Sequence, residues 1–77
     1  MKPYIKSLGD ITSNVWDVKD AGNSVSFKSN EQYEERDCAF AIGDKRYDGW
    51  EIRPVSYNDF GGDYKHVASK RHHDENP

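Results

Sequence analysis

The sequence predicts a small α+β domain that is mostly β, built on an antiparallel meander of about four strands with one or two short helical segments. Three observations point to this class. The chain has 77 residues, enough for one domain with a thin core. Turn residues such as Gly43-Asp44 recur along the chain, and apolar and polar residues alternate between them. We place the domain at residues 1–71 and expect residues 72–77 to form a disordered tail.

The first strand pair is expected around a turn at residues 20–23. Residues 24–29 alternate strictly, with Val25 and Phe27 on one side and serine and lysine side chains on the other. Residues 14–18 carry β-branched and aromatic side chains on the other side of the turn. Together the two segments predict a β-hairpin.

Two further strands are expected in the second half of the chain. Residues 38–43 are apolar on both faces, which predicts a central strand. Residues 47–55 alternate, with Asp48-Gly49 as a candidate β-bulge. Because proline has no backbone N–H, Pro54 should end this strand or lie at a sheet edge. The expected buried face carries Trp16, Val18, Val25, Phe27, Phe40, Ile42, Trp50 and Ile52.

Two segments are expected to differ from the strands: one is a helical turn or a loop with equal weight, and the other is a short helix. Asn30 is a suitable N-cap for a helical turn over residues 31–37, whose acidic side chains favour a helix N-terminus; a wide charged loop is the alternative. A short helix is expected over about residues 63–70, where apolar side chains follow helical spacing. That spacing joins Tyr57, Phe60, Tyr64 and Val67 and is interrupted by Gly61-Gly62.

Composition and charge exclude several classes of protein. No segment approaches 18 consecutive apolar residues, and the N-terminal sequence lacks the apolar core of a signal peptide. The one cysteine cannot form an internal disulfide, so we expect a cytoplasmic protein. The net charge of −3 combines 11 basic with 14 acidic residues, which disfavours a dedicated duplex-DNA-binding protein.

Groups capable of catalysis are few, and we expect no enzymatic activity, no cofactor and no metal site. Cys38 shares a strand face with Phe40 and Ile42, which is typical of a small buried hydrophobic residue rather than a nucleophile paired with histidine. His72 and His73 follow no metal-ligand motif.

Protein binding is the function that this composition favours. The chain has more aromatic residues than a core of this size needs, and tyrosine and tryptophan are enriched at interfaces. We predict a non-catalytic module that inhibits or modulates a larger protein with a basic surface by covering that surface. Phages and mobile elements direct small proteins of this kind at host enzymes or defence complexes. The expected contact residues are Glu31, Tyr33, Glu34, Glu35, Tyr57, Phe60 and Tyr64.

Two alternatives remain open from the sequence. A nucleic-acid-binding accessory protein would use basic and aromatic residues on a small sheet. The residues that suit this role are Lys45, Arg46, Tyr47, Lys65, Lys70 and Arg71. A homodimer is also open, because a second copy of the chain could cover the apolar face of the sheet.

Overall fold

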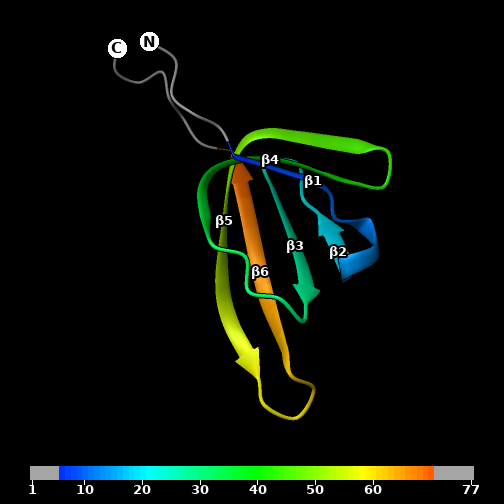
Figure 1. Ribbon diagram of the computed structural model, residues 1–77, viewed down its shortest axis with the longest axis vertical. Helices are drawn as coiled ribbons and strands as arrows, with labels where there is room; N and C mark the ends of the chain where they lie inside the picture. The colour runs from blue at the N-terminus through cyan, green and yellow to red at the C-terminus, as the bar shows by residue number, and fades with distance from the viewer. Residues whose placement is uncertain (1–5, 71–77) are drawn as a thin grey trace.

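The computed structural model describes residues 6–70, which form one mixed six-stranded sheet in the order β1-β4-β5-β6-β3-β2 (Figure 1). The predicted tail at residues 72–77 lies outside the described residues. β1 runs parallel to β4, and the other neighbouring strands are antiparallel. The elements are β1 (Lys6–Asp10), the 3₁₀ helix η1 (Thr12–Asn14), β2 (Val15–Asp20), β3 (Ser24–Ser29), β4 (Glu35–Ile42), β5 (Lys45–Asn58) and β6 (Asp63–Lys70).

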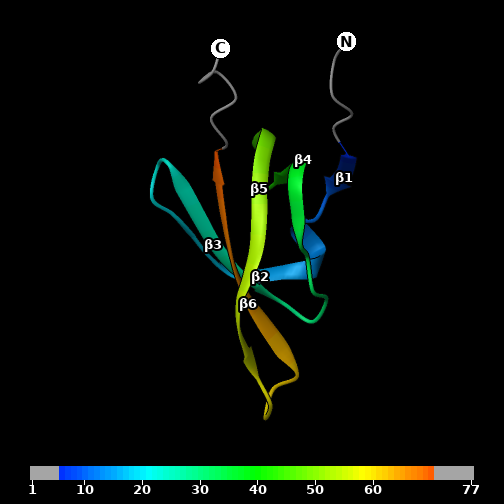
Figure 2. The same ribbon diagram turned by 90° about the vertical axis from the view of Figure 1, so that its left-hand side faces the viewer.

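The sheet is curled into a partly open barrel. β1 and β2 lie at its two opposite edges, yet only residues 11–14 separate them in the chain. The five steps from Asp10 to Val15 span at most about 18 Å, whereas the edges of a flat six-stranded sheet lie about 24 Å apart. The edges must therefore approach one another. Figure 2 shows β3 and β4 on opposite sides of β5, with β2 leading back toward β1.

Backbone and side-chain hydrogen bonds fix the connection between the two edges. The Ile11 N–H donates to the Ala41 carbonyl of β4 at 3.0 Å. The Gly43 N–H, in the turn between β4 and β5, donates to Thr12 Oγ1 at 2.7 Å. The start of η1 is thus attached to the β4–β5 hairpin, which holds the curled sheet in place.

The core fills the inner side of this barrel. Its buried hydrophobic residues are Ile11, Val25, Phe27, Cys38, Phe40, Tyr47, Trp50, Ile52 and Ala68. Five of the eight residues expected to be buried are therefore confirmed, and Ile42 is partly buried against them. The prediction was wrong for Trp16 and Val18, whose exposed fractions are 42% and 40%. The cause is local: Trp16 pairs with Lys28 on the outer face, and Asp17 has a φ of 54° in an irregular edge strand.

A segment over residues 30–34 crosses the inner face, because β4 lies three strands away from β3 (Figure 1). The helical turn expected over residues 31–37 is therefore wrong, whereas the alternative of a loop holds for residues 30–34, and β4 begins at Glu35. The Tyr33 ring lies 6.2 Å from that of Phe27 and 5.6 Å from that of His66, and its N–H donates to His66 Nε2 at 3.0 Å. His66, fully buried, thereby anchors the crossing segment.

The mostly-β class is confirmed, but the four-stranded antiparallel meander is wrong. β1 was not expected at all. The expected helix over residues 63–70 is instead strand β6. Its helical spacing has another origin: Tyr57 and Tyr64 pair directly across the β5–β6 hairpin, and Phe60 lies in the turn between them. A tight hairpin thus places apolar side chains at intervals that resemble a helix.

Two local expectations about β5 can be judged from strand register. Cys38 pairs with Trp50 and Ala39 pairs with Asp48, so Gly49, with a φ of 75°, is the extra residue of the predicted bulge. The strand does not stop at Pro54, so the first of the two outcomes expected for this proline does not hold. The pairings of β5 with β4 end at Ile52, however, so Pro54 lies on a stretch with one open side, as an edge proline should.

Replacing Phe27 by alanine should reduce the free energy of unfolding by about 3–5 kcal/mol, because it removes a fully buried ring. Phe60→Ala is the matched control. Its ring is fully exposed, so the change should stay within about 0.5 kcal/mol. Urea denaturation followed by circular dichroism measures both values. Equal losses in the two variants would contradict the assigned inner face.

Folding stability should fall in mild acid because of His66. Burial lowers the pKa of its imidazole below the ordinary 6.5, so the unfolded chain binds more protons than the folded one. The stabilisation that the neutral, buried imidazole gives the folded state is fully present above about pH 6.5. It is lost as the pH falls through the lowered native pKa. Protonation also removes the acceptor for the Tyr33 N–H.

His66→Gln keeps an acceptor for Tyr33 but does not titrate between pH 5 and pH 7. Urea unfolding at several pH values in that range should therefore show a steeper acid loss for the natural chain than for the variant. All other titrating groups are common to both chains, so they cancel in this comparison. Identical slopes would refute the role assigned to His66.

Candidate functional site

The β5–β6 hairpin projects at one end of the molecule (Figure 1). From Pro54 to Asn58, β5 pairs with β6 alone, because its pairings with β4 end at Ile52. The Asn58–Asp63 pair closes the hairpin, and residues 59–62 form its turn. The first half of this 14-residue strand thus belongs to the barrel, and its second half forms one side of the projecting hairpin.

The turn at the hairpin tip is held by its own hydrogen bonds. Asn58 Oδ1 accepts from the Phe60 N–H at 3.2 Å, and the Asn58 carbonyl accepts from the Gly62 N–H at 2.8 Å. Asn58 Nδ2 also donates to Asp63 Oδ1 at 3.2 Å. A Cβ at Gly61 would collide with the Asp63 carboxylate, so a larger residue there would displace the Asn58–Asp63 contact. Phe60 is therefore presented to solvent from a fixed turn.

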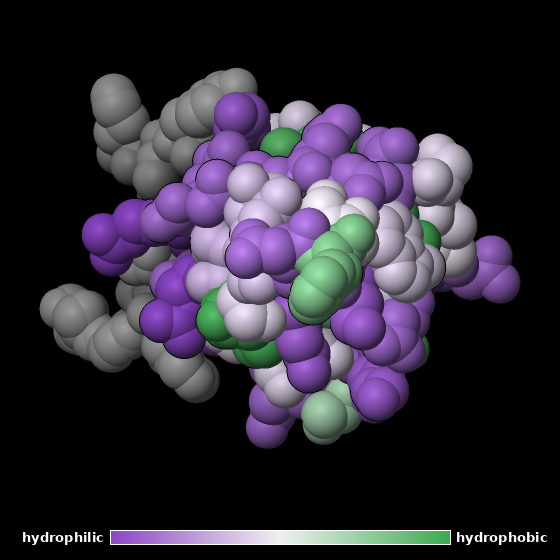
Figure 3. All heavy atoms as spheres, turned by 90° about the horizontal axis from the view of Figure 1, so that it is seen from below, coloured by the Kyte–Doolittle hydropathy of each residue, from purple (hydrophilic) through white to green (hydrophobic). Residues whose placement is uncertain are grey.

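Apolar side chains surround this tip. Val55 and Tyr57 each have exposed fractions of 51%, and Phe60 is fully exposed. The rings of Tyr57 and Tyr64 lie 4.6 Å apart, and that of Tyr64 lies 6.2 Å from His66 in the core. We call Val55, Tyr57, Phe60 and Tyr64 the hairpin surface. Figure 3 looks at this end of the molecule and shows hydrophobic groups standing among hydrophilic ones.

The crossing segment brings acidic groups toward the hairpin surface. Asn30 Nδ2 donates to the Gly62 carbonyl at 3.2 Å, so residues 30–34 are attached to the turn. Burial raises the pKa of the Tyr33 hydroxyl, and the nearby charge of Glu31 raises it further. Glu31 thus lies beside Tyr33, and Glu34 is exposed on the same segment. This end of the molecule therefore combines aromatic rings with negative charge.

Most of the residues expected to bind a protein are brought together in this way. Tyr57, Phe60 and Tyr64 belong to the hairpin surface. Glu31 and Tyr33 lie on the crossing segment, which is attached to the hairpin turn through Asn30, and the Tyr33 ring packs on the core. Glu35 lies elsewhere, because it belongs to β4 and forms an ion pair with Lys6 of β1 at 3.1 Å. Val55 was missed by the sequence reasoning, since the strand was expected to end at Pro54.

The residues expected to bind nucleic acid are not brought together. Lys45 Nζ lies 2.6 Å from the Asp20 carboxylate, an ion pair between β5 and the far edge strand β2. Tyr47 is 3% exposed and stacks on Phe40 at 4.8 Å, so its expected role as an accessible stacking ring is wrong. The others are dispersed: Arg46 pairs with Asp48, Lys65 lies on the outer face, Lys70 lies at the end of β6, and Arg71 lies outside the described residues.

The thiol of Cys38 is buried in the core, as its strand position indicated. Burial, followed by the charges of Glu35 and Asp37, raises its pKa to about 11. Its Sγ donates to the Trp50 carbonyl at 3.3 Å. Burial and the raised pKa disfavour the thiolate, which is the reactive form of cysteine.

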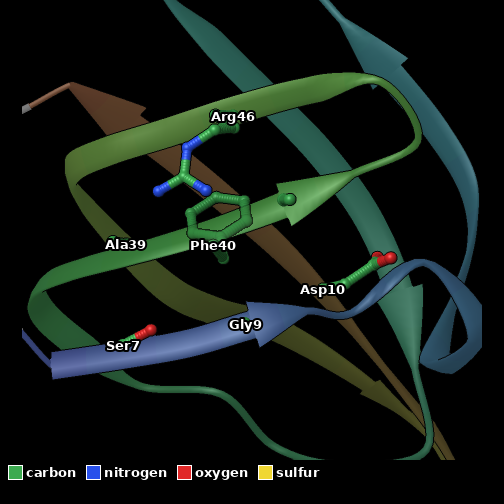
Figure 4. A pocket seen from close by; sticks show the side chains of 7 residues that line it. Ser7, Gly9, Asp10, Ala39, Phe40 and Arg46 are labelled. Atoms are coloured by element: carbon green, nitrogen blue, oxygen red, sulfur yellow. The ribbon is translucent and has the colours of Figure 1, made fainter.

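A shallow, open hollow of about 130 Å³ lies on the outer face of β1, β4 and β5. Figure 4 shows the Arg46 guanidinium over β4 beside Phe40, with the Asp10 carboxylate apart from it. Arg46 pairs with Asp48 at 3.3 Å, and Asp10 accepts from the Thr12 N–H at 3.0 Å. The polar groups of this hollow are therefore engaged by neighbours rather than directed at a common point.

Two features are absent from residues 6–70. No group of three or more histidine, cysteine, aspartate or glutamate side chains in this range could hold a metal ion. Within the same range, no helix has the length and apolar character needed to span a membrane.

Comparison with known proteins assigns this chain to no family. No protein-family model matches the chain, and no curated protein or solved structure matches it. The hairpin surface itself therefore carries the functional argument.

Proposed function

We propose that this chain is a non-catalytic protein-binding module that inserts Phe60 into an apolar pocket of a larger protein. One observation carries the proposal: a fully exposed phenylalanine stands on a turn that is fixed by hydrogen bonds. Burying such a side chain contributes about 1.5–3 kcal/mol of favourable free energy, and Phe60 contributes none of this to folding because it stays exposed. The whole of this free energy is therefore available when Phe60 is buried against a partner.

The fixed turn favours tight binding, because little conformational entropy is lost when the tip is already ordered. Tyr57 and Val55 flank Phe60 and supply the contacts that exclude water around a central anchor. Tyrosine and phenylalanine on a short polar turn also resemble the loops with which antibodies bind. Contact with a protein pocket therefore suits this surface better than contact with a small polar ligand.

Charge supports a partner with a basic rim around its pocket. Asp59 in the turn and Glu31 and Glu34 on the crossing segment are exposed. A basic surface would be attracted to these groups, which speeds encounter and fixes orientation. The net charge of −3 acts in the same direction.

Occlusion is the proposed mode of action. The hairpin surface and the crossing segment together cover the part of the partner around the pocket, so access of other molecules to that part is blocked. No catalytic group is needed for this mechanism. It suits an inhibitor of an enzyme or complex whose working surface is basic.

Phe60→Ala should weaken binding to the partner about 30-fold, which corresponds to the 2 kcal/mol typical of an interface hot spot. The partner is captured on the tagged chain from a nuclease-treated lysate, identified by mass spectrometry and titrated by calorimetry. Val18→Ala is the control, since Val18 is also exposed but lies on edge strand β2. Retention of full affinity by a folded Phe60→Ala variant would overturn the proposal, as would the capture of no protein.

A further inference from the structure

Cations from four strands lie on the same outer side of the sheet as an exposed tryptophan. Residues that pair across antiparallel strands point to the same side, so the register defines this face. One row runs from Trp16 through Lys28 to Lys65. The next row runs through Lys19, Ser26, Val67 and Arg53. We call Trp16, Lys19, Lys28, Arg53 and Lys65 the outer basic face.

The pair of Lys28 and Lys65 is unfavourable for folding. The two lysines lie directly opposite one another on neighbouring strands, where like charges reduce stability. Asp17 lies 3.6 Å from Lys28 Nζ, but Lys65 has no ion-pair partner among residues 6–70. No acidic side chain within residues 6–70 therefore compensates the second charge. An anion bound between the two lysines would do so.

The face as a whole is positive although the chain is negative. Its four cations have two acidic partners, Asp17 at Lys28 and Glu51 at Arg53, the latter at 3.7 Å. Four positive and two negative charges leave a balance of +2, against −3 for the whole chain. Positive charge is thus concentrated on the outer side of the four neighbouring strands β2, β3, β6 and β5.

Trp16 identifies the kind of anion. Trp16 is 42% exposed at the sheet edge and is not part of the buried core cluster. A flat ring beside ammonium groups is suited to stack on a nucleobase while the ammonium groups contact phosphates. We infer that the outer basic face binds single-stranded nucleic acid. An acidic protein would use the cations but would leave the tryptophan without a stacking partner.

This face is independent of the proposed protein-binding surface. Lys65 points outward, whereas its neighbours Tyr64 and His66 belong to the ring contacts on the inner side. Phe60 lies in the hairpin turn, outside the rows that form the face. One chain can therefore hold a protein at the hairpin and a nucleic acid strand on the sheet at the same time.

Fluorescence anisotropy tests the inference with fluorescein-labelled oligo(dT) and oligo(U) of about 12 nucleotides, within the usual range of site sizes. At about 50 mM salt we expect saturable binding with a Kd between about 1 and 100 µM. Trp16→Ala should weaken binding about tenfold through lost stacking. Lys65→Ser should weaken it and make the salt dependence shallower by about 0.7 in log–log slope.

Lys70→Ser is the matched control. Lys70 lies on the same strand as Lys65 and carries the same charge, but it pairs with the buried Trp50 and so belongs to the inner side. We expect this variant to bind like the natural chain. Thermal unfolding should show all three variants folded, with Lys65→Ser melting at or above the natural chain because the like-charge pair is removed.

Four results would overturn the inference. Absence of saturable binding to both oligonucleotides would do so, as would equal weakening by Lys65→Ser and Lys70→Ser, which would indicate net charge alone. Competition by poly-glutamate as effective as competition by unlabelled oligonucleotide would point to an acidic protein. Self-association in sedimentation that disappears in Trp16→Ala would show that a second copy covers the face.

Discussion

The short connection between β1 and β2 constrains the rest of the structure. Four residues join strands at opposite edges of a six-stranded sheet, so the sheet must curl until those edges are close. Curling requires a bend in the central strand, and the Gly49 bulge supplies it in β5. It also gives the sheet an inner side that β3, β5 and β6 fill with large rings. The crossing segment then closes that side through Tyr33 and His66.

The same curvature separates the two surfaces to which function is assigned. Past Ile52, β4 no longer accompanies β5, so the end of the β5–β6 hairpin is free to carry Phe60 beyond the barrel. Within residues 6–70 no element covers the outer side of β2, β3 and β6, and its polar and basic side chains are half-buried or exposed. A thin core of aromatic rings thus fixes the position of the outer basic face relative to the hairpin surface.

Local pattern was enough to find features that depend on neighbouring residues. It predicted the β2–β3 hairpin, the bulge at Gly49 and the aromatic residues around Phe60. It failed where the outcome depends on which strands pair. The burial of Tyr47 follows from its stacking on Phe40, and the exposure of Trp16 follows from the edge position of β2. The outer basic face was missed because its cations are distant in sequence and adjoin only through the register of four strands.

The strand order also has a consequence for the rate of folding. The β2–β3, β4–β5 and β5–β6 pairs are hairpins, but the pairs that complete the sheet join residues distant in the chain, such as Lys6 with Cys38 and Ser24 with Ser69. Closing such long loops loses chain entropy before any stabilising contact has formed. Sheets rich in distant pairings therefore fold slowly. We expect the three hairpins to form early and barrel closure to limit the rate. The hairpin that carries Phe60 would then exist before the barrel around its base is complete.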